Sequence, residues 1–210
     1  MPVVYLIDER VSNPKLILDS IPEADMGFLI NPHLTVGQIV SVVIKGLVTR
    51  GEETIRGKSE LPMITELRIL AAGHDEELRL GWGINARNAV QLAPLSLYLS
   101  TGASGRCSLL GYNAALNRPR REQFLGGSAM GQRFGSPGYG WGPEDLDIPD
   151  EPGFELVGVI ARTLGVPVTA GLDTHTTPFD WCFLDATVTI DPFGEVTYSG
   201  MDLPGPSNDF

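Results

Sequence analysis

Short apolar runs alternate along this chain with longer segments in which apolar residues recur at helical spacing. A run that is apolar at nearly every position suits a strand covered on both faces, as in the centre of a parallel sheet. Residues 2–8 are such a run; further strands are expected at residues 26–30, 64–73, 105–116 and 166–172, and helical patterns occupy residues 12–21, 35–51, 88–102 and 153–165. Strands that alternate with helices predict an α/β fold, in which a mainly parallel central sheet has helices on both faces.

Capping residues, glycines and prolines bound the predicted helices. Pro14 suits the first turn of the first helix. Thr35 can cap the second helix and Gly51 can end it. Pro94 predicts a kink in the third helix, and Gly165 ends the fourth.

The last part of the chain and one long segment depart from this alternation. Residues 182–200 alternate apolar and polar about the sequence DPFG at 191–194, so they predict an antiparallel β-hairpin. Residues 118–153 are rich in glycine and proline and far exceed the usual loop of about 4–6 residues. We therefore expect a single domain over residues 1–210 with a long inserted loop at 118–153.

Charge and composition exclude several classes of function. The net charge of −11 argues against a nucleic-acid-binding protein, which would carry a basic surface. No apolar run approaches the roughly 20 residues of a membrane span, and the N-terminus lacks the basic start of a signal peptide. We expect a cytoplasmic protein, or one exported without a signal peptide as part of an assembly.

Neither the cysteines nor the glycine pattern predicts a cofactor. Cys107 and Cys182 are too few for a disulfide framework and are interpreted as small buried residues. The sequence GWGINA at 81–86 matches the dinucleotide pattern Gly-x-Gly-x-x-Ala, but no acidic residue ends a following strand about 20 residues later. We expect no cofactor.

Candidate site residues follow three of the predicted strands. Ligands of open α/β sheets bind beyond the carboxyl ends of the strands. The residues at that edge are Ala72, Gly73, His74 and Asp75 after the third strand, Tyr112 and Asn113 after the fourth, and Asp173 and His175 after the fifth. Neighbouring strands of this kind would present the base and the nucleophile of a cysteine peptidase side by side.

Three motifs in this order resemble those of a caspase-like bacterial domain of unknown function found in large surface and adhesin-type proteins. The motifs are AAGHDEELRLG at 71–81, LLGYNAAL at 109–116 and TAGLDTHTTPFDWCFLDA at 169–186. They stand where that family reads SHG with LQLG, then LYGCN, then AAS with a W-x-LE hairpin start. The resemblance implies a caspase-like three-layer sandwich with a C-terminal hairpin.

The departures from the family motifs concern the catalytic pair. Ala72 stands at the histidine position, His74 is displaced from it by two residues, and Tyr112 replaces the nucleophilic cysteine. A phenol with a pKa of about 10 replaces a thiolate poorly. Cys107 precedes Tyr112 by five residues, roughly 16 Å along a strand. The sequence therefore predicts a catalytically inactive caspase-like domain that is a binding or structural component of a larger assembly.

Two other interpretations remain open. One is a hydrolase, cysteine-peptidase-like or metal-assisted, with a rearranged site around His74, Asp173 and His175; we expect no metal, but these residues and Asp75 are the candidate ligands. The other is a generic doubly wound domain, which the hairpin beyond the fifth strand would distinguish.

The inserted loop is expected to bind a protein partner or a second copy of the chain. It carries three bulky rings, Phe134, Tyr139 and Trp141, among flexible glycines and prolines. Tyrosine and tryptophan are frequent anchors of protein interfaces. The alternative is that the loop covers an edge of its own sheet.

Overall fold

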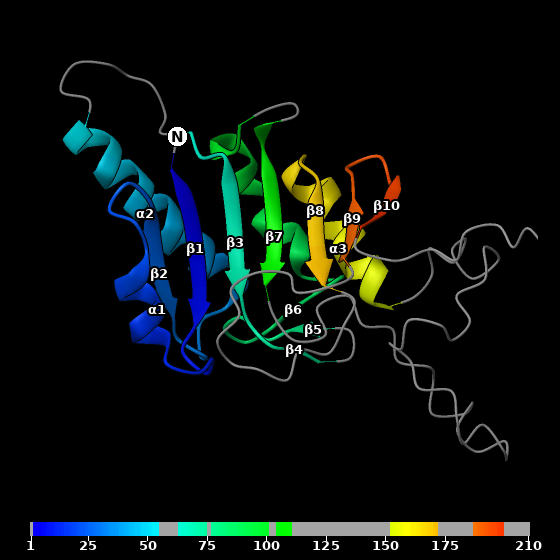
Figure 1. Ribbon diagram of the computed structural model, residues 1–210, viewed down its shortest axis with the longest axis horizontal. Helices are drawn as coiled ribbons and strands as arrows, with labels where there is room; N and C mark the ends of the chain where they lie inside the picture. Colours follow the sequence, from blue (N-terminus) through cyan, green and yellow to red (C-terminus); the bar gives the residue numbers. More distant parts are fainter. Residues whose placement is uncertain are drawn as a thin grey trace, which may run out of the picture.

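The computed structural model describes residues 2–54, 63–74, 77–100, 104–110, 152–171 and 187–199 (Figure 1). Seven strands form one sheet in the order β10-β9-β8-β7-β3-β1-β2. They are β1 (Val3–Asp8), β2 (Met26–Ile30), β3 (Glu66–Leu70), β7 (Arg106–Leu110), β8 (Val168–Gly171), β9 (Thr187–Ile190) and β10 (Val196–Ser199). Strands β2, β1, β3, β7 and β8 pair in parallel, and β9 and β10 extend the sheet in antiparallel pairing. The predicted α/β fold with a mainly parallel sheet is confirmed.

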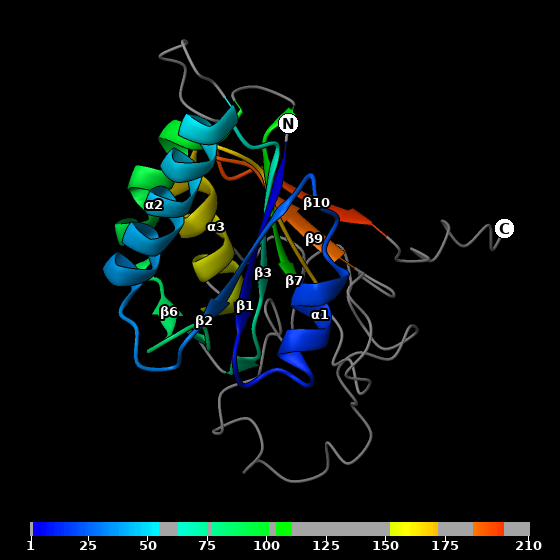
Figure 2. The ribbon, with the colours of Figure 1, turned by 90° about the vertical axis from the view of Figure 1, so that its left-hand side faces the viewer.

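Helices lie on both faces of this sheet, as predicted (Figure 2). They are α1 (Pro14–Ser20), α2 (Val36–Thr54), η1 (Ala89–Tyr98) and α3 (Pro152–Leu164). The residues of α2, η1 and α3 share one large core with alternate residues of the strands, from Val4 of β1 to Ile190 of β9. Helix α1 packs on the opposite face, where Ile17 contacts Ile7 and Leu70 in a smaller core.

Helix α2 begins as the sequence predicts and ends later. Thr35 and Gln38 form a reciprocal cap: the Thr35 hydroxyl accepts a hydrogen bond from the Gln38 N–H (3.4 Å), and the Gln38 amide oxygen accepts one from the Thr35 N–H (2.9 Å). The predicted end at Gly51 is wrong, because the helix continues to Thr54. A glycine ends a helix only where the backbone turns left-handed, and Gly51 remains helical.

The third predicted helix is a 3₁₀ helix, η1, rather than a kinked α-helix. Its buried side chains are Ala89, Leu92, Leu95 and Tyr98, one at every third position. In an α-helix Ala89 and Tyr98 would lie on opposite sides, because nine residues make two and a half turns. With three residues per turn, all four side chains face the core.

The C-terminal hairpin is confirmed for the described residues from Thr187 onward. The turn between β9 and β10 follows the predicted DPFG sequence. The Asp191 carboxylate accepts hydrogen bonds from the backbone N–H groups of Phe193 (2.9 Å) and Glu195 (2.8 Å), and Gly194 adopts a φ of 93°. These contacts fix the turn at the edge opposite the carboxyl ends of the parallel strands (Figure 1).

Two details correct the predicted boundaries. The strand expected at 64–73 ends at Leu70, and Gly73–His74 (β4) instead joins Glu77–Leu78 (β5) and Ile84–Asn85 (β6) in a small antiparallel sheet. Helix α3 begins at Pro152, so the end of the predicted inserted loop belongs to that helix; residues 118–151 lie outside the described part of the chain.

None of the described helices has the length and apolar character to cross a membrane.

Candidate functional site

The carboxyl edge of the parallel sheet holds the predicted site residues that the structure describes. Leu70 of β3 pairs with Leu110 of β7, so these two strands end side by side at this edge. Ala72, Gly73 and His74 follow β3 directly. The other predicted residues lie outside the described part of the chain. They are Asp75, Tyr112, Asn113, Asp173 and His175, which were predicted for this edge, and Phe134, Tyr139 and Trp141, which were predicted for the inserted loop.

The backbone after β3 turns back on itself. The Arg79 N–H donates a hydrogen bond to the Ala72 carbonyl oxygen (2.7 Å), Gly73 pairs with Leu78, and His74 pairs with Glu77. Ala72, which the resemblance to the caspase-like motif aligns with a histidine, is half-buried. Its side chain is a methyl group, which cannot accept a proton. The displaced His74 belongs to a strand of the small sheet.

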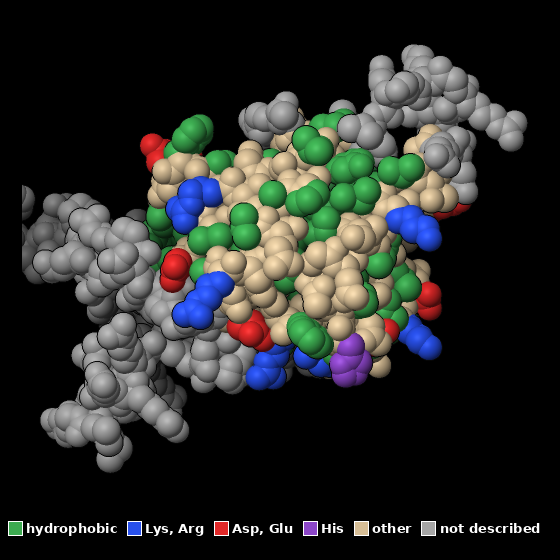
Figure 3. All heavy atoms as spheres, turned by 180° about the vertical axis from the view of Figure 1, so that it is seen from behind, with side chains coloured by type: hydrophobic (Ala, Val, Ile, Leu, Met, Phe, Trp, Pro, Cys, Tyr) green, Lys and Arg blue, Asp and Glu red, His purple; other side chains and the backbone are tan. Residues whose placement is uncertain are grey.

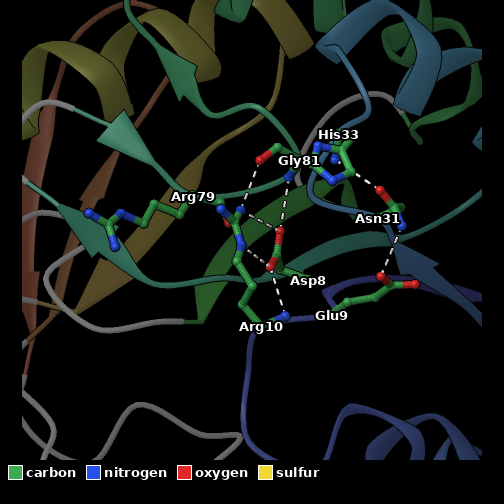
Figure 4. Close-up of polar contacts among 7 residues, drawn as sticks. All are labelled: Asp8, Glu9, Arg10, Asn31, His33, Arg79 and Gly81. Atoms are coloured by element: carbon green, nitrogen blue, oxygen red, sulfur yellow. Dashed lines mark hydrogen bonds and ion pairs between the residues drawn. The ribbon is translucent and has the colours of Figure 1, made fainter.

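A buried carboxylate, Asp8, anchors this edge at the end of β1 (Figure 4). Its side chain is 1% exposed. Oδ1 accepts hydrogen bonds from the Arg10 backbone N–H (2.9 Å) and from Nε (2.7 Å), and Oδ2 accepts from Nη2 of Arg10 (2.9 Å) and the Gly81 N–H (2.9 Å). Four donors occupy both oxygens, so this carboxylate serves as a structural clamp instead of a free general base.

Arg10 extends the clamp to the segment after β5. Its Nη2 donates to the carbonyl oxygens of Arg79 and Gly81, both at 2.8 Å (Figure 4). The hydrogen bond with Asp8 raises the pKa of the Arg10 guanidinium above its ordinary value, against a smaller effect of burial. Three hydrogen bonds to backbone atoms therefore hold residues 8–10 and 79–81 together, and the ion pair between Asp8 and Arg10 orients the two side chains that make them.

The clamped segment presents a tryptophan to solvent. Trp82 is 70% exposed, although its backbone N–H donates a hydrogen bond to the Leu34 carbonyl oxygen (2.9 Å). Gly81 has a φ of 60°, and a Cβ atom there would collide with the Leu34 carbonyl oxygen. The next glycine, Gly83, donates to Leu80 (3.0 Å) and accepts from the Asn88 side-chain amide (2.9 Å). The backbone around Trp82 is thus fixed while its ring is free.

This arrangement explains the GWGINA sequence. The two glycines belong to the turn between β5 and β6, which pair antiparallel in the small sheet. A dinucleotide motif instead joins a parallel strand to the N-terminus of an α-helix. Sequence reasoning missed Asp8, Arg10 and Trp82 as site residues. The one available signal was an acid and a cation two residues apart, directly after a buried strand.

The second loop of this edge carries an exposed histidine. Asn31 follows β2, and its amide donates to the Glu9 carboxylate (3.1 Å) while its oxygen accepts from the His33 N–H (2.9 Å) (Figure 4). These contacts order the backbone of the loop between β2 and α2. No sequence motif assigned a role to His33, and its ring is exposed.

Cys107 is fully buried in β7, on the face covered by α2, η1 and α3. Burial raises the pKa of its thiol well above the ordinary value, and the charge of Glu66 raises it further. The prediction that Cys107 is buried within a strand is confirmed. Cys182 lies outside the described residues.

A charged cluster that the sequence did not predict lies on the opposite face of the sheet. Glu66, 3% exposed, accepts hydrogen bonds from Ser108 Oγ (2.7 Å), Arg106 Nη2 (2.9 Å) and Arg68 Nη2 (3.0 Å). Arg68 also donates to the Tyr5 hydroxyl (3.1 Å) and lies over its ring, 5.3 Å from the centroid. Burial alone would raise the pKa of Glu66, but the three hydrogen bonds together lower it.

The described residues contain no group of three or more His, Cys, Asp or Glu side chains that could hold a metal ion. Three of the four candidate ligands named from the sequence lie outside these residues. Comparisons of the chain with protein families, with curated proteins and with solved structures find no significant match.

Proposed function

We propose that this chain is a catalytically inactive caspase-like domain that acts as a binding or structural component of a larger assembly. The observation that carries the proposal is the position of Ala72 after β3, where the resemblance requires a histidine. A methyl group there leaves a neighbouring nucleophile without a base, and activation needs the two within hydrogen-bond reach.

The strand order supports the caspase-like part of the proposal. The parallel strands follow the order β2-β1-β3-β7-β8, and the β9–β10 hairpin extends the sheet beyond β8. The parallel order alone is common to flavodoxin-like doubly wound domains. The antiparallel hairpin next to the fifth strand is the feature that favours the caspase-like arrangement.

The polar groups of the described edge also support a non-catalytic role. Asp8 and Arg10 hold backbone atoms of residues 79–81, and Asn31 holds the loop before α2. Cys107 faces the helices on the other side of β7 from Glu66 and is fully buried. The charged groups among these residues, on Asp8 and Arg10, make hydrogen bonds that fix the fold.

Peptidase chemistry is tested on the purified chain with a fluorogenic peptide library and iodoacetamide followed by intact-mass measurement. We expect no cleavage and no rapid labelling of either cysteine. Cleavage that is lost in Cys182→Ser or His74→Ala would overturn the proposal in favour of a thiol hydrolase. Stoichiometric zinc or manganese in the purified protein, lost in His74→Ala, would favour the metal-assisted alternative.

The binding role of the inserted loop has its own test. We propose that Phe134, Tyr139 and Trp141 contact another chain. Trp141→Ala is then expected to weaken assembly, measured by capture of partners from the native host, and to leave the melting temperature of the isolated chain nearly unchanged. A lower melting temperature with unaffected assembly would place the loop in the protein's own core. Deletion of residues 126–142 is the corresponding loop-wide variant.

A further inference from the structure

Strand β2 ends the sheet in the described part of the chain, and its outer edge has no neighbouring strand there. The strand order stops at β2, which pairs with β1 alone. Figure 2 looks onto this edge: β2 lies in front of the rest of the sheet, between α2 and α1, and no described helix or strand passes in front of it. Its first four residues are half-buried, whereas four of the five residues of the inner strand β3 are buried.

Two residues of β2 direct their backbone polar groups away from the sheet. The Ile30 carbonyl oxygen accepts a hydrogen bond from the Glu9 N–H at the end of β1 (3.0 Å), so the groups of Ile30 point toward β1. Because these groups alternate in direction along a strand, those of Phe28 also point toward β1, and those of Gly27 and Leu29 point outward. No hydrogen bond between described residues engages the outward groups, so two donors and two acceptors are free.

The sequence of β2 lacks the usual protection of an edge strand. Charged side chains, prolines and bulges normally keep such edges from pairing with another chain. Strand β2 reads MGFLI and pairs with β1 at every residue without a bulge. Protection is present only at its amino end, where the Arg50 guanidinium of α2 donates to the carbonyl oxygens of residues 23–25. The unprotected part of the edge is therefore residues 27–29.

Apolar side chains flank this part of the edge on both faces of the sheet. On the α2 side, a Cβ atom at Gly46 would collide with the Phe28 ring, so the helix packs directly on that ring. Val42 precedes Gly46 by one helical turn on the same side of α2 and is 42% exposed. On the α1 side, Leu18 lies over Gly27 in the same way. An added strand would place alternate side chains beside apolar groups on both faces.

The charges near this edge favour a basic partner. Exposed carboxylates lie toward both ends of it: Glu23 precedes β2, and Glu9 lies beside the last residue of β2. Lys15 of α1 and Lys45 of α2 are each two residues from a buried residue of their helix, about 200° around it, so they point away from the sheet. Arg50 is engaged by backbone carbonyl oxygens. On the α2 side of the molecule, cations and anions both lie toward the rim (Figure 3).

We propose that residues 27–29 of β2 bind an extended peptide segment of a partner protein, with an uncharged centre and lysine or arginine at its ends. The added backbone pairs with the free groups of Gly27 and Leu29, the mode in which main-chain hydrogen bonds supply the affinity. Its end cations meet Glu9 and Glu23. A second copy of the chain fits less well, because antiparallel pairing through this edge brings Glu23 of one copy toward Glu9 of the other, and each copy has a net charge of −11. As a functional statement the inference rests on the proposed assembly role, for which it names the kind of partner.

The probe is a phage-displayed library of random peptides of about ten residues, selected on the purified full-length chain. Selected peptides are synthesised and titrated by fluorescence anisotropy. We expect a run of uncharged β-branched or aromatic residues between lysines or arginines, because such residues suit a strand. In hydrogen exchange followed by NMR, a bound peptide should slow exchange of the Gly27 and Leu29 amides and leave the amides of β10 unchanged.

Leu29→Pro is the variant that tests the edge itself. It removes an outward N–H and keeps the bonds to β1, and an edge strand tolerates proline at such a position. The dissociation constant of the selected peptides should rise more than about tenfold, the loss of roughly 1.4 kcal/mol or more. Val196→Pro in β10 is the matched control and should bind like the wild type. The N–H of Val196 also points outward, because the preceding Glu195 accepts from Asp191 across the hairpin.

Three results would overturn the proposal: a selection that yields no binding peptide, peptides that bind Leu29→Pro as tightly as the wild type, or a wild-type dimer that Leu29→Pro abolishes, which would assign the edge to a second copy. Should Leu29→Pro melt below Val196→Pro, exchange of the wild-type chain decides, and unchanged rates at Gly27 and Leu29 would overturn the proposal. A failed selection on a chain without peptidase activity would leave the proposed function standing. An active peptidase that binds peptides along β2 would do the reverse.

Discussion

Cys107 shows how one position decides the chemistry of a side chain. Its thiol is enclosed by the core between the sheet and the helices, and burial raises its pKa. A thiol reacts through its thiolate, so Cys107 should be inert at neutral pH.

We expect Cys107 to be alkylated by iodoacetamide only after unfolding. In native buffer at pH 7.5 its labelling should be at least a hundredfold slower than in guanidinium chloride, measured by peptide mass spectrometry. Fast native labelling that a peptide inhibitor prevents would show that this thiol belongs to an active site, contrary to its position in β7.

Glu66 gives the chain a stability that depends on pH. Burial works against its charge, but the hydrogen bonds from Arg68, Ser108 and Arg106 lower its pKa below the ordinary value of 4.5. A carboxyl group whose pKa is lower in the folded state stabilises the fold at pH values above the unfolded pKa. That contribution is lost as the pH falls through the folded pKa.

The variant Glu66→Gln should therefore lower the free energy of unfolding by about 2 kcal/mol at pH 7, less than the roughly 3–5 kcal/mol of fully buried pairs, because Arg68 and Arg106 reach solvent. The difference from the wild type should shrink as the pH falls below about 4. Urea denaturation at several pH values measures it. Glu23→Gln, the same substitution at an exposed position, is measured beside it as the control. A difference for Glu66→Gln that stays constant with pH would contradict the lowered pKa.

Among the helices and strands, η1 depends on its three-residue repeat. Leu95 is fully buried by that repeat, and Leu97, two residues on, is 68% exposed. The same substitution at these two positions separates the inner from the outer side of the helix.

We expect Leu95→Ala to lower the free energy of unfolding by about 2–4 kcal/mol, as for other buried leucines. Leu97→Ala should change it by less than about 0.5 kcal/mol, as for surface positions. Both are measured by urea denaturation. Similar losses at the two positions would mean that η1 is enclosed on both sides within one chain.

The sheet and most helices could be predicted because their periodicity reflects burial directly. Strand β1 is covered on both faces for most of its length and reads as an apolar run, whereas β3 alternates Leu67 and Ile69 of the large core with Glu66 and Arg68. The type of η1 escaped prediction because α- and 3₁₀-helices share the i, i+3 spacing over short stretches, and only the distance from Ala89 to Tyr98 separates them. The two-residue strands of the small sheet are too short to show a period.

The candidate site was predictable in place but not in its contacts. Parallel strands end at one edge, so residues after β3 and β7 were expected together, and the pairing of Leu70 with Leu110 shows that the two strands end together; the residues after Leu110 lie outside the described part of the chain. The clamp could not be predicted because Asp8 binds the backbone N–H of Gly81, 73 residues away, and a backbone group leaves no mark in the sequence.

At the scale of the molecule, this clamp joins the end of β1, which lies next to the edge strand β2, to the small sheet. Asp8→Ala should leave Arg10 without its partner and free the Gly81 N–H, at a cost of about 3 kcal/mol. Hydrogen exchange should quicken at Gly81 and Trp82, while exchange in β9 and β10 keeps its wild-type rate at low denaturant. Loss of protection throughout the large sheet, without a specific increase in the exchange rate at Gly81 and Trp82, would mean that the small sheet and the large sheet open as one unit.

The exposed position 82 has a consequence for how such a surface can change. The fold there depends on backbone atoms and on the neighbours Gly81 and Gly83, whereas the Trp82 ring lies largely in solvent. Almost any residue can therefore replace tryptophan at little thermodynamic cost, while a substitution of either glycine disrupts the turn. Selection acting on position 82 is released from the requirements of folding, so a lineage carrying this scaffold can change this surface one residue at a time.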